Sequence, residues 1–341
     1  MLAMPPIVTG ILSYGMSGKV FHAPFLAENE NFIFRAVVER STKVAQSRYP
    51  NILSYTSVEA LLADPEIELV VVNTPNDTHV DFAMQALKAG KHVLIEKPFA
   101  PTAAEAQALF DLGRAVGRVV LPYHNRRFDS DFKSLKYIVD KHLTGAAIEL
   151  HLRFDRYRPE IGPKTFKETR KPAAGVMFDL GSHLLDQVIS LFGKPKSSTK
   201  ILSKNRDHSK VDDYGCLILN YSNGPQVFIT CSLLVAAPLP SFVLHGTVGT
   251  FIKERSDVQE TQLLAGIVPS DPNYGQEQDG QAGTLTVVHA DKTVETLPVP
   301  SAQGSYMDVY DAVFSHIRMR EPYYVTEEQI LIQLEILSSL K

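Results

Sequence analysis

A short apolar run that ends in a glutamate and a lysine is the first place where the sequence indicates chemistry. Residues 92–95 include β-branched residues and lie between Gly90 and Pro98, which favours a buried strand over a helix. Glu96 and Lys97 follow at the carboxyl end of this strand, where open α/β sheets bind their ligands. Because a proline restricts the residue before it, Lys97 is held extended and can donate to a substrate oxygen. The alternative is a solvated lysine at the end of a strand.

A second stretch, residues 175–193, carries a histidine between two carboxylates. Its apolar residues fit one stripe of an amphipathic helix, and Asp179, His183 and Asp186 stand at i, i+4 and i+7 on another face. Such a polar stripe is ordinarily the solvated side of a helix. This stripe contains no Lys or Arg, and a histidine titrates near neutral pH, as a general base requires. The stretch is therefore a candidate for acid–base chemistry.

The first half of the chain alternates between strand-like and helix-like runs. The strands are expected at residues 7–12, 33–38, 69–73, 92–95 and 119–121, and the helices at 57–63, 77–89 and 102–116. Apolar strands without polar alternation, joined by helices, indicate a parallel sheet that is covered on both faces. With right-handed crossovers, this sheet becomes a doubly wound, or Rossmann, α/β fold.

A degenerate glycine loop follows the first of these strands. Residues 13–18 read SYGMSG, which is G-x-G-x-x-G with Ser13 in place of the first glycine. Gly15 would let the backbone approach a pyrophosphate, and Gly18 would let the next helix pack closely on the strand. The same pattern also fits a tight strand-to-helix turn that binds nothing.

The end of the second strand is expected to select the cofactor. Glu39 lies about 20 residues after the glycine loop, at the offset where an acidic side chain holds the ribose 2′-hydroxyl of NAD. Arg40 and Ser41 follow immediately and could instead hold the 2′-phosphate of NADP. These residues leave both cofactors open.

The second half has a different pattern, in which apolar and polar residues alternate with the period of half-buried strands. Such runs occur at residues 148–155, 214–221, 226–235, 241–245, 285–289 and 293–297, with turn residues Asn223-Gly224 and Asp291-Lys292 between neighbours. Helical runs follow at 305–320 and 326–340. We expect a mostly antiparallel open sheet, and hence two domains, residues 1–123 and 124–341. The last helix could pack either on this sheet or back on the first domain.

Composition excludes several classes of protein. The 341 residues are 44% hydrophobic and 21% charged with a net charge of −4, which gives no reason to expect nucleic acid or an anionic membrane as a partner. The two cysteines lack metal-binding spacing, so neither a metal site nor a disulfide framework is expected. No leader-like segment or long apolar run occurs near the N-terminus, and we expect a cytoplasmic protein.

Three motifs together resemble one family. The Glu96-Lys97-Pro98 triplet, the pair Asp179 and His183, and the HNRR run at residues 124–127 are similar to the glucose–fructose oxidoreductase and inositol dehydrogenase (Gfo/Idh/MocA) family, nearest its NADP-dependent scyllo-inositol dehydrogenase branch. The resemblance covers nearly the whole chain. It implies reversible hydride transfer between NAD(P) and a secondary alcohol of a sugar or inositol-type polyol, with a modest preference for NADP.

The same resemblance implies roles for the acid–base residues. His183 would accept and return the hydroxyl proton, and Lys97 would hydrogen-bond the reacting oxygen. Asp179 would position the substrate or the imidazole, and Asp186 could hold the other ring nitrogen. Glu96, together with Lys97, would contribute to cofactor binding.

Three polar residues after the third strand of the parallel sheet are similar to a family segment that lies along the cofactor. Thr74, Asn76 and His79 are therefore candidate ribose or phosphate contacts. Capping of the following helix is an alternative role for this turn, and the two roles are compatible.

The substrate side is less defined. Asn125, Arg126 and Arg127 could line the substrate crevice, or the arginines could pair with Asp129 and Asp131 to fix the domains.

Residues 156–171 form a basic, proline-containing segment that could be a lid, in which Tyr157 and Arg158 reach substrate hydroxyls; a plain surface loop is the alternative. Relatives carry an aromatic residue, usually Trp, near Phe166. This chain has no Trp, so the fit to a particular substrate is not carried over.

The resemblance also leaves other assignments to be weighed. Family members commonly form dimers through the second sheet, which implies a homodimer or homotetramer. A non-catalytic cofactor-sensing regulator of the same fold and an NAD-dependent glycosidase are the alternative functions, and retention of both Lys97 and His183 argues against the regulator.

Overall fold

The computed structural model describes residues 4–162 and 168–339, which fall into two compact units. The first unit comprises residues 1–125, 259–274 and 305–331, and the second comprises 126–258, 275–304 and 332–341. The chain therefore leaves the first unit close to the expected boundary after residue 123, but it also returns to that unit twice. The return of residues 259–274 was not expected from the sequence, whereas a return of the last helix to the first domain was considered.

The first unit is built on six parallel strands in the order β3-β2-β1-β4-β5-β6. Their bounds are β1 Ile7–Ile11, β2 Phe32–Val38, β3 Leu53–Tyr55, β4 Leu69–Val72, β5 His92–Ile95 and β6 Val120–Pro122. β4 is completely buried, as a strand covered on both faces requires. The predicted doubly wound parallel sheet is confirmed; β3 is a short addition that the sequence pattern did not reveal.

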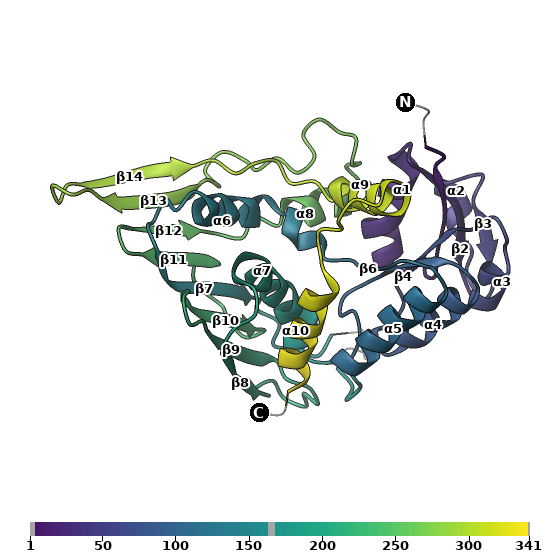
Figure 1. Cartoon of the computed structure of the whole chain (residues 1–341), viewed down its shortest axis with the longest axis horizontal. Coiled ribbons are helices and arrows are strands. Elements are labelled where there is room, and N and C mark those ends of the chain that lie inside the picture. The colour runs from purple at the N-terminus through teal and green to yellow at the C-terminus, as the bar shows by residue number, and fades with distance from the viewer. Residues whose placement is uncertain (1–3, 163–167, 340–341) are drawn as a thin grey trace. The chain divides into compact units, whose positions relative to one another are not determined.

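Helices follow the strands in the usual alternation (Figure 1). They are η1 Gly18–His22, α1 Ala23–Glu28, α2 Ala45–Arg48, α3 Val58–Leu62, η2 Asn76–Thr78, α4 His79–Lys88 and α5 Ala103–Ala115. Ser57 and Thr102 cap α3 and α5 by accepting the backbone N–H of Ala60 and Glu105, so these helix starts follow directly from the sequence.

An aromatic cluster joins the late part of the chain to the first unit. Helix α9 (Met307–Phe314) places Tyr310 in a stack on Phe25 of α1, with ring centroids 5.7 Å apart, and Phe314 against Phe32 of β2 at 6.3 Å. α9 continues into η6 (Ser315–Met319). Because Phe25 and Tyr310 are fully buried, the core of the first unit is completed only by residues near the C-terminus.

The second unit contains eight strands in the order β14-β13-β12-β11-β7-β10-β9-β8. Their bounds are β7 Ala147–Asp155, β8 Ser197–Ser203, β9 Tyr214–Asn220, β10 Gln226–Ser232, β11 Phe242–Gly246, β12 Gly249–Lys253, β13 Gly283–Val288 and β14 Val294–Val299. Only the β7–β10 pair is parallel among the strand pairs of this sheet that the structure describes. The predicted mostly antiparallel sheet is confirmed, with β8 and β12 as strands that were not predicted.

One face of this sheet is covered by helices (Figure 1). They are η3 Asn125–Phe128, which begins at the last residue of the first unit, α6 Ser130–Asp140, η5 Met177–Gly181, α7 Ser182–Phe192 and the end of α10 (Glu327–Ser338). Apolar residues of α6 and α7, such as Leu135 and Leu184, pack with Leu150 and Leu152 of β7 in one core. A short helix, α8 (Val258–Leu264), begins at the last residue of the second unit and continues into the first.

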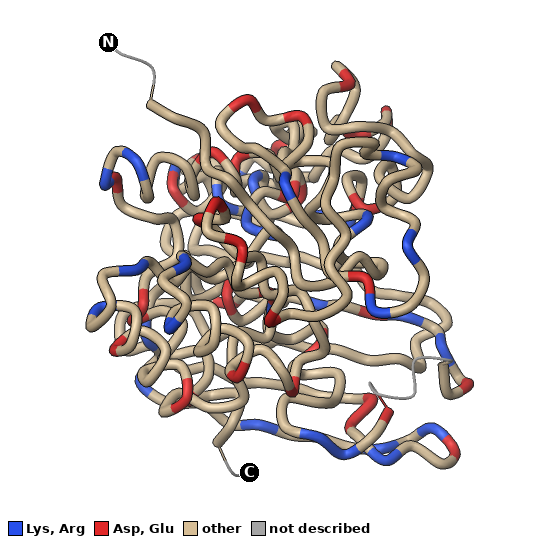
Figure 2. Tube along the Cα trace, turned by 90° about the vertical axis from the view of Figure 1, so that its right-hand side faces the viewer, with Lys and Arg blue, Asp and Glu red and all other residues tan. Residues whose placement is uncertain are grey.

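Charged residues of both signs are interspersed along the chain trace (Figure 2). Within residues 4–162 and 168–339, every helix is too short or too polar to cross a bilayer. In the same ranges, no three His, Cys, Asp or Glu side chains gather as a metal site would need.

Candidate active site

The glycine loop is closed by hydrogen bonds to the neighbouring strand. Asn73, just after β4, accepts the backbone N–H of Ser13 at 2.9 Å and donates to the Ser13 carbonyl at 2.8 Å. A Cβ on Gly18 would overlap that carbonyl oxygen, so only glycine allows η1 to start so close to the loop. Gly15 has more room, since the nearest atom to a Cβ there would be Oγ of Ser13 at 3.4 Å.

A cavity of about 420 Å³ lies beside this loop, and it brings together six of the residues that the sequence assigned to the cofactor. These are Ser13, Gly15, Glu39, Arg40, Ser41 and Thr74. Strands β1, β2 and β4 end at this cavity, as expected for the carboxyl edge of a doubly wound sheet. The exposed glycine, the helix start and the arginine are the donors that a dinucleotide requires, so the residues present fit NAD(P).

The carboxylate of Glu39 accepts hydrogen bonds from other residues of the protein. Its Oε1 accepts the backbone N–H of Val44 at 2.7 Å and of Ala45 at 3.1 Å, at the start of α2, and its Oε2 accepts from the hydroxyl of Ser54 at 2.7 Å. The neighbouring Arg40 is exposed and makes no hydrogen bond or ion pair with other described residues. The carboxylate therefore organises this loop, while the guanidinium remains accessible at the cavity.

The turn after β4 is held by its own side chains. The hydroxyls of Thr74 and Thr78 are 2.7 Å apart, and Asn76 starts the short helix η2. The ring nitrogens of His79 lie 2.9 Å from the carbonyl oxygens of Pro98 and Thr74, and the side chain is buried. Burial lowers the pKa of His79, although the two carbonyls oppose this. His79 is thus placed to hold Thr74 and the Lys97-Pro98 turn rather than to face the cavity.

Glu96 and Lys97 stand at the end of β5, where Lys97 precedes a cis proline. Oε1 of Glu96 accepts from the hydroxyl of Ser17 at 2.8 Å and lies 3.0 Å from Nε2 of His22, and Oε2 accepts the backbone N–H of Lys97 at 3.1 Å. Burial alone would raise the pKa of Glu96, but His22, Ser17 and Lys97 lower it to about 2. An ionised carboxylate therefore links the glycine loop to Lys97.

In the second unit, Asp179 and His183 lie on consecutive helical turns of different kinds. Asp179 belongs to the π-helical turn η5 and His183 to the first turn of α7, where its side chain is 6% exposed. The segment begins at Gly175, whose φ is +97° and where a Cβ would overlap the carboxylate of Asp212. π-helical turns are rare and frequent at functional sites. The structure thus brings the two residues to one helix start, although not on the continuous α-helix that was expected.

Asp186 and Arg127 form a buried bidentate ion pair. Nε of Arg127 donates to Oδ2 at 2.8 Å, and Nη2 donates to Oδ1 at 2.7 Å. Both oxygens of Asp186 accept from this guanidinium. The expectation that Asp186 holds a ring nitrogen of His183 stays a prediction. Arg127 was a candidate substrate contact, and the structure gives it a partner on α7.

Arg126 is likewise paired within the second unit. Its Nη1 lies 3.0 Å from Asp129 and 2.8 Å from Asp257, and the guanidinium sits over the ring of Phe154. The pairing of Arg126 with Asp129 agrees with the alternative in which the arginines pair with nearby carboxylates. Asp131, the other expected partner, instead accepts the backbone N–H of Phe132 and Ser256. Asn125, the last residue of the first unit, is buried.

Tyr157 and Arg158 extend the strand pairing of β7. Tyr157 forms a bridge to Leu234 and is 61% exposed, and the backbone N–H of Arg158 donates to the carbonyl of Leu233 at 2.7 Å. Residues 163–167, with Phe166, lie outside the described residues. Both named side chains are accessible.

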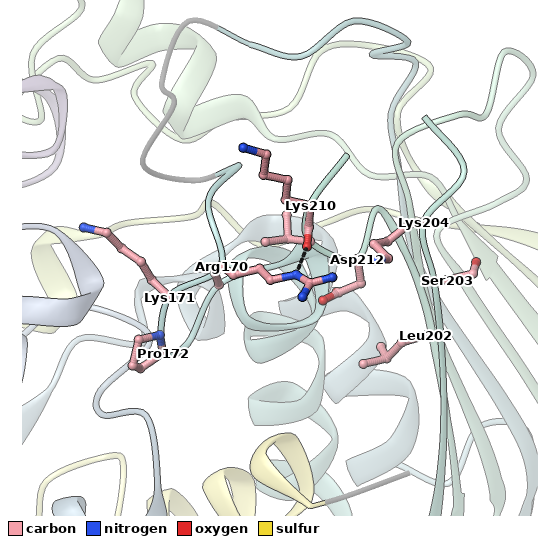
Figure 3. Close-up of a pocket in the computed structure, with 10 residues that line it drawn as sticks. Arg170, Lys171, Pro172, Leu202, Ser203, Lys204, Lys210 and Asp212 are labelled. Atoms are coloured by element: carbon pink, nitrogen blue, oxygen red, sulfur yellow. Dashed lines mark hydrogen bonds between the residues drawn. The ribbon is translucent and has the colours of Figure 1, made fainter. Parts of the chain in front are cut away.

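The end of the same segment lines a cavity of about 490 Å³ in the second unit (Figure 3). Nε of Arg170 donates to the carbonyl of Lys210 at 3.2 Å, the dashed line in Figure 3, and Lys171 and Lys204 add further positive charge. Burial raises the pKa of Asp212 at this cavity, despite the backbone N–H groups that it accepts.

Sequence reasoning did not assign roles to His22, Ser17 or Tyr310. All three connect to Glu96, directly or through His22, and they come from η1, the glycine loop and α9. The available signal was a histidine at the end of the helix that follows a nucleotide loop. Its partner Tyr310 is 288 positions away, and no local pattern reveals that pairing.

Comparison with known proteins gives matches along the whole chain. Residues 7–124 match the Gfo/Idh/MocA family model described as an oxidoreductase family with an NAD-binding Rossmann fold, and residues 146–340 match the model of its C-terminal α/β domain. An uncharacterised oxidoreductase of Schizosaccharomyces pombe is 39% identical over 98% of this chain and 96% of its own length. The NADP-dependent scyllo-inositol 2-dehydrogenase IolW of Bacillus subtilis is 34% identical over 98% and 92%.

Solved structures show the same correspondence. The oxidoreductase YvaA of Bacillus subtilis superposes with a TM-score of 0.93 at 32% identity, covering 99% of this chain and 95% of that one. An oxidoreductase from Bacteroides fragilis gives a TM-score of 0.88 at 37% identity, over 97% and 95%. This chain therefore matches both solved structures over nearly their whole length.

Proposed function

Because this chain belongs to the Gfo/Idh/MocA oxidoreductase family, we propose that it transfers a hydride between NADP and a secondary alcohol of a sugar or an inositol-type polyol. The substrate class is supported by the scyllo-inositol dehydrogenase relative, which is similar over nearly the full length. The observation that carries the proposal is the contact of Glu96 with Ser17. It ties the amide of Lys97 to the glycine loop, the element that a dinucleotide requires.

The chemistry assigns a distinct task to each residue. When bound, the nicotinamide accepts the hydride in oxidation and returns it in reduction. Lys97 donates a hydrogen bond to the reacting oxygen and stabilises the charge that develops there. His183 takes the hydroxyl proton on a ring nitrogen and returns it in the reverse direction, and Asp179 orients the substrate or the imidazole.

A screen of polyols and aldoses tests this reaction directly. Formation of NAD(P)H is followed at 340 nm with each cofactor, first for the wild type and then for Lys97→Met and His183→Asn. We expect each substitution to lower kcat by about 10²–10⁴-fold while cofactor affinity changes little. The double variant should lose much less than the product of the two factors, because both groups serve one transition state.

A matched control is Lys88→Met, which removes an exposed lysine at the end of α4. It should keep wild-type kcat. Wild-type kcat in His183→Asn under chemistry-limited conditions would remove His183 from the mechanism. Tight cofactor binding by the wild type without turnover of any substrate would instead support the cofactor-sensing alternative.

We assign the preference for NADP to Arg40. Glu39 has both oxygens engaged by Val44, Ala45 and Ser54, whereas Arg40 is exposed at the cofactor cavity. A guanidinium pairs well with a phosphate, and an engaged carboxylate is less able to hold a ribose hydroxyl. Arg40→Ala should lower kcat/KM for NADP by about tenfold to a hundredfold, since charged hydrogen bonds contribute roughly 1.5–3 kcal/mol. The value for NAD should stay the same, and an unchanged ratio of the two would contradict the assignment.

A further inference from the structure

A chain of buried polar side chains stands behind Glu96 in the first unit. His22 is completely buried at the end of η1, with Nε2 3.0 Å from Oε1 of Glu96 and Nδ1 2.7 Å from the hydroxyl of Tyr310. The ring of Tyr123 packs against the imidazole, with centroids 4.6 Å apart. The reaction proposed above gives none of these side chains a role.

Both ring nitrogens of His22 are engaged by buried partners. The ionised carboxylate of Glu96 only accepts, so Nε2 of His22 must donate. The carbonyl of Phe21 accepts from the hydroxyl of Tyr123 at 2.9 Å and from that of Tyr310 at 3.2 Å. The hydroxyl of Tyr310 also lies 2.7 Å from Nδ1 of His22 and so holds the side of the ring opposite Glu96. Each of these buried polar groups therefore has a hydrogen-bond partner, as buried polar groups require.

Glu96 is the link between this network and the site. The oxygen that faces His22 also accepts from Ser17 in the glycine loop, and its other oxygen accepts the amide of Lys97. If Nε2 of His22 were lost, Oε1 would keep only the Ser17 hydroxyl, and the carboxylate could turn about its side-chain bonds. Such a turn would release the amide of Lys97 and the loop at the same time.

We propose that His22 is a positioning residue for Lys97, acting through Glu96, with the hydroxyl of Tyr310 holding the other side of the imidazole. The inference rests on the proposed function for the role of Lys97. His22 touches neither substrate nor cofactor in this scheme; it holds the carboxylate that orients them. Groups that orient a reacting residue are effective because a displacement of about 1 Å can cost 10²-fold in rate.

Three substitutions test the chain of contacts. His22→Leu removes the donor to Glu96 and should lower kcat by about tenfold to a hundredfold. His22→Gln supplies an amide N–H in its place and should recover most of that loss. Tyr310→Phe keeps the ring and removes only the hydroxyl that contacts Nδ1 of His22, so its kcat should lie between those of His22→Leu and the wild type.

Tyr323→Phe is the matched control. Its buried hydroxyl donates to the carbonyl of Pro122 at 3.0 Å in the same unit. It should keep wild-type kcat. Should His22→Leu fail to fold, the comparison of Tyr310→Phe with Tyr323→Phe decides: equal kcat values would overturn the proposal, and a selective loss in Tyr310→Phe would support it.

A pH titration separates positioning from a general loss of stability. The pKa of Glu96 is followed by ¹³C NMR of labelled glutamate, which needs no turnover. It should rise in His22→Leu, since His22 is the largest favourable contributor to the low value, and stay near about 2 in Tyr323→Phe. An unchanged pKa and an unchanged kcat in His22→Leu would overturn the proposal, whereas an inactive wild type with the expected NMR shift would contradict only the proposed reaction.

Discussion

Two glycines of the glycine loop differ in whether they have room for a side chain. A Cβ on Gly18 would overlap the carbonyl of Ser13, whereas one on Gly15 would meet only Oγ of Ser13 at ordinary distance. Gly18→Ala should therefore lower both the free energy of unfolding, by about 1–3 kcal/mol as overpacked sites do, and the affinity for NADPH. Thermal melts and a fluorescence titration with NADPH measure the two effects.

Gly15→Ala is the companion variant. It should keep the wild-type melting temperature and lose only nucleotide affinity, because its Cβ would occupy the exposed side where a pyrophosphate approaches. Equal NADPH affinity in both variants and the wild type would show that this loop does not bind the nucleotide.

Some residue placements could be predicted from the sequence and others could not. The placement of Gly15 and Glu39 at one cavity, and of Glu96 and Lys97 at the end of β5, could be anticipated because these residues stand at fixed offsets from strands. Their roles in binding and catalysis stay predictions. The engagement of Glu39 with α2 was not predictable, since α2 has only four residues and no clear periodicity.

At the scale of elements, the helix that carries Asp179 and His183 shows a limit of periodicity. The i, i+4 spacing was interpreted on an α-helix, but residues 177–181 form a π turn, which changes the rotation between the two side chains. The π turn begins beside Gly175 and Asp212. Asp212 accepts the backbone N–H of Met177 at 3.1 Å. Because this support comes from another segment, local sequence could not reveal it.

Strand β5 also carries a pH-sensitive contact. Nδ1 of His92 accepts the backbone N–H of Val119 at 2.9 Å, and burial, with a contribution from Arg118, lowers the pKa of His92 to about 4. As the pH falls from about 6.5 towards 4, the unfolded chain binds a proton at this site that the folded chain does not, so stability is lost in that window.

His92→Asn removes this titration, because an Asn side-chain oxygen can still accept from Val119 but takes up no proton. Chemical denaturation at pH 7 and pH 5 should show a smaller loss of unfolding free energy in the variant than in the wild type. An identical loss in both proteins would show that His92 does not contribute to the acid sensitivity.

At the scale of the whole molecule, the uncovered face of the second sheet carries a row of side chains that the strand register aligns. Ile218 on β9 pairs with Phe228 on β10, which pairs with His151 on β7. His151 in turn pairs with Val243 on β11, and Val243 with Ile252 on β12. Apolar residues on an uncovered face favour association, and we propose that a second copy of the chain covers this row.

Phe228→Asp should therefore shift the protein to a smaller species in light scattering coupled to size-exclusion chromatography. Val116→Asp, which places the same charge on an exposed apolar residue after α5 of the first unit, should leave the mass unchanged. A wild type that already runs as a monomer would refute the proposal.

Domain organisation was the part of the fold least accessible from sequence. The parallel and antiparallel halves were recognised because their hydrophobic periods differ. The return of residues 259–274 and 305–331 to the first unit has no such local signal, since α9 appears as an ordinary amphipathic helix until Tyr310 is seen against Phe25.

The late completion of the first unit bears on how the chain is made. A ribosome that has released residues 1–125 has delivered the entire parallel sheet, yet Phe25 and Phe32 still lack the rings of Tyr310 and Phe314. The nascent Rossmann half must wait for about 180 further residues, the interval from 125 to 305, before its aromatic core can close. During that interval its exposed apolar surface makes it prone to aggregation and a substrate for chaperones. We expect a chain truncated after residue 125 to aggregate rather than to fold independently.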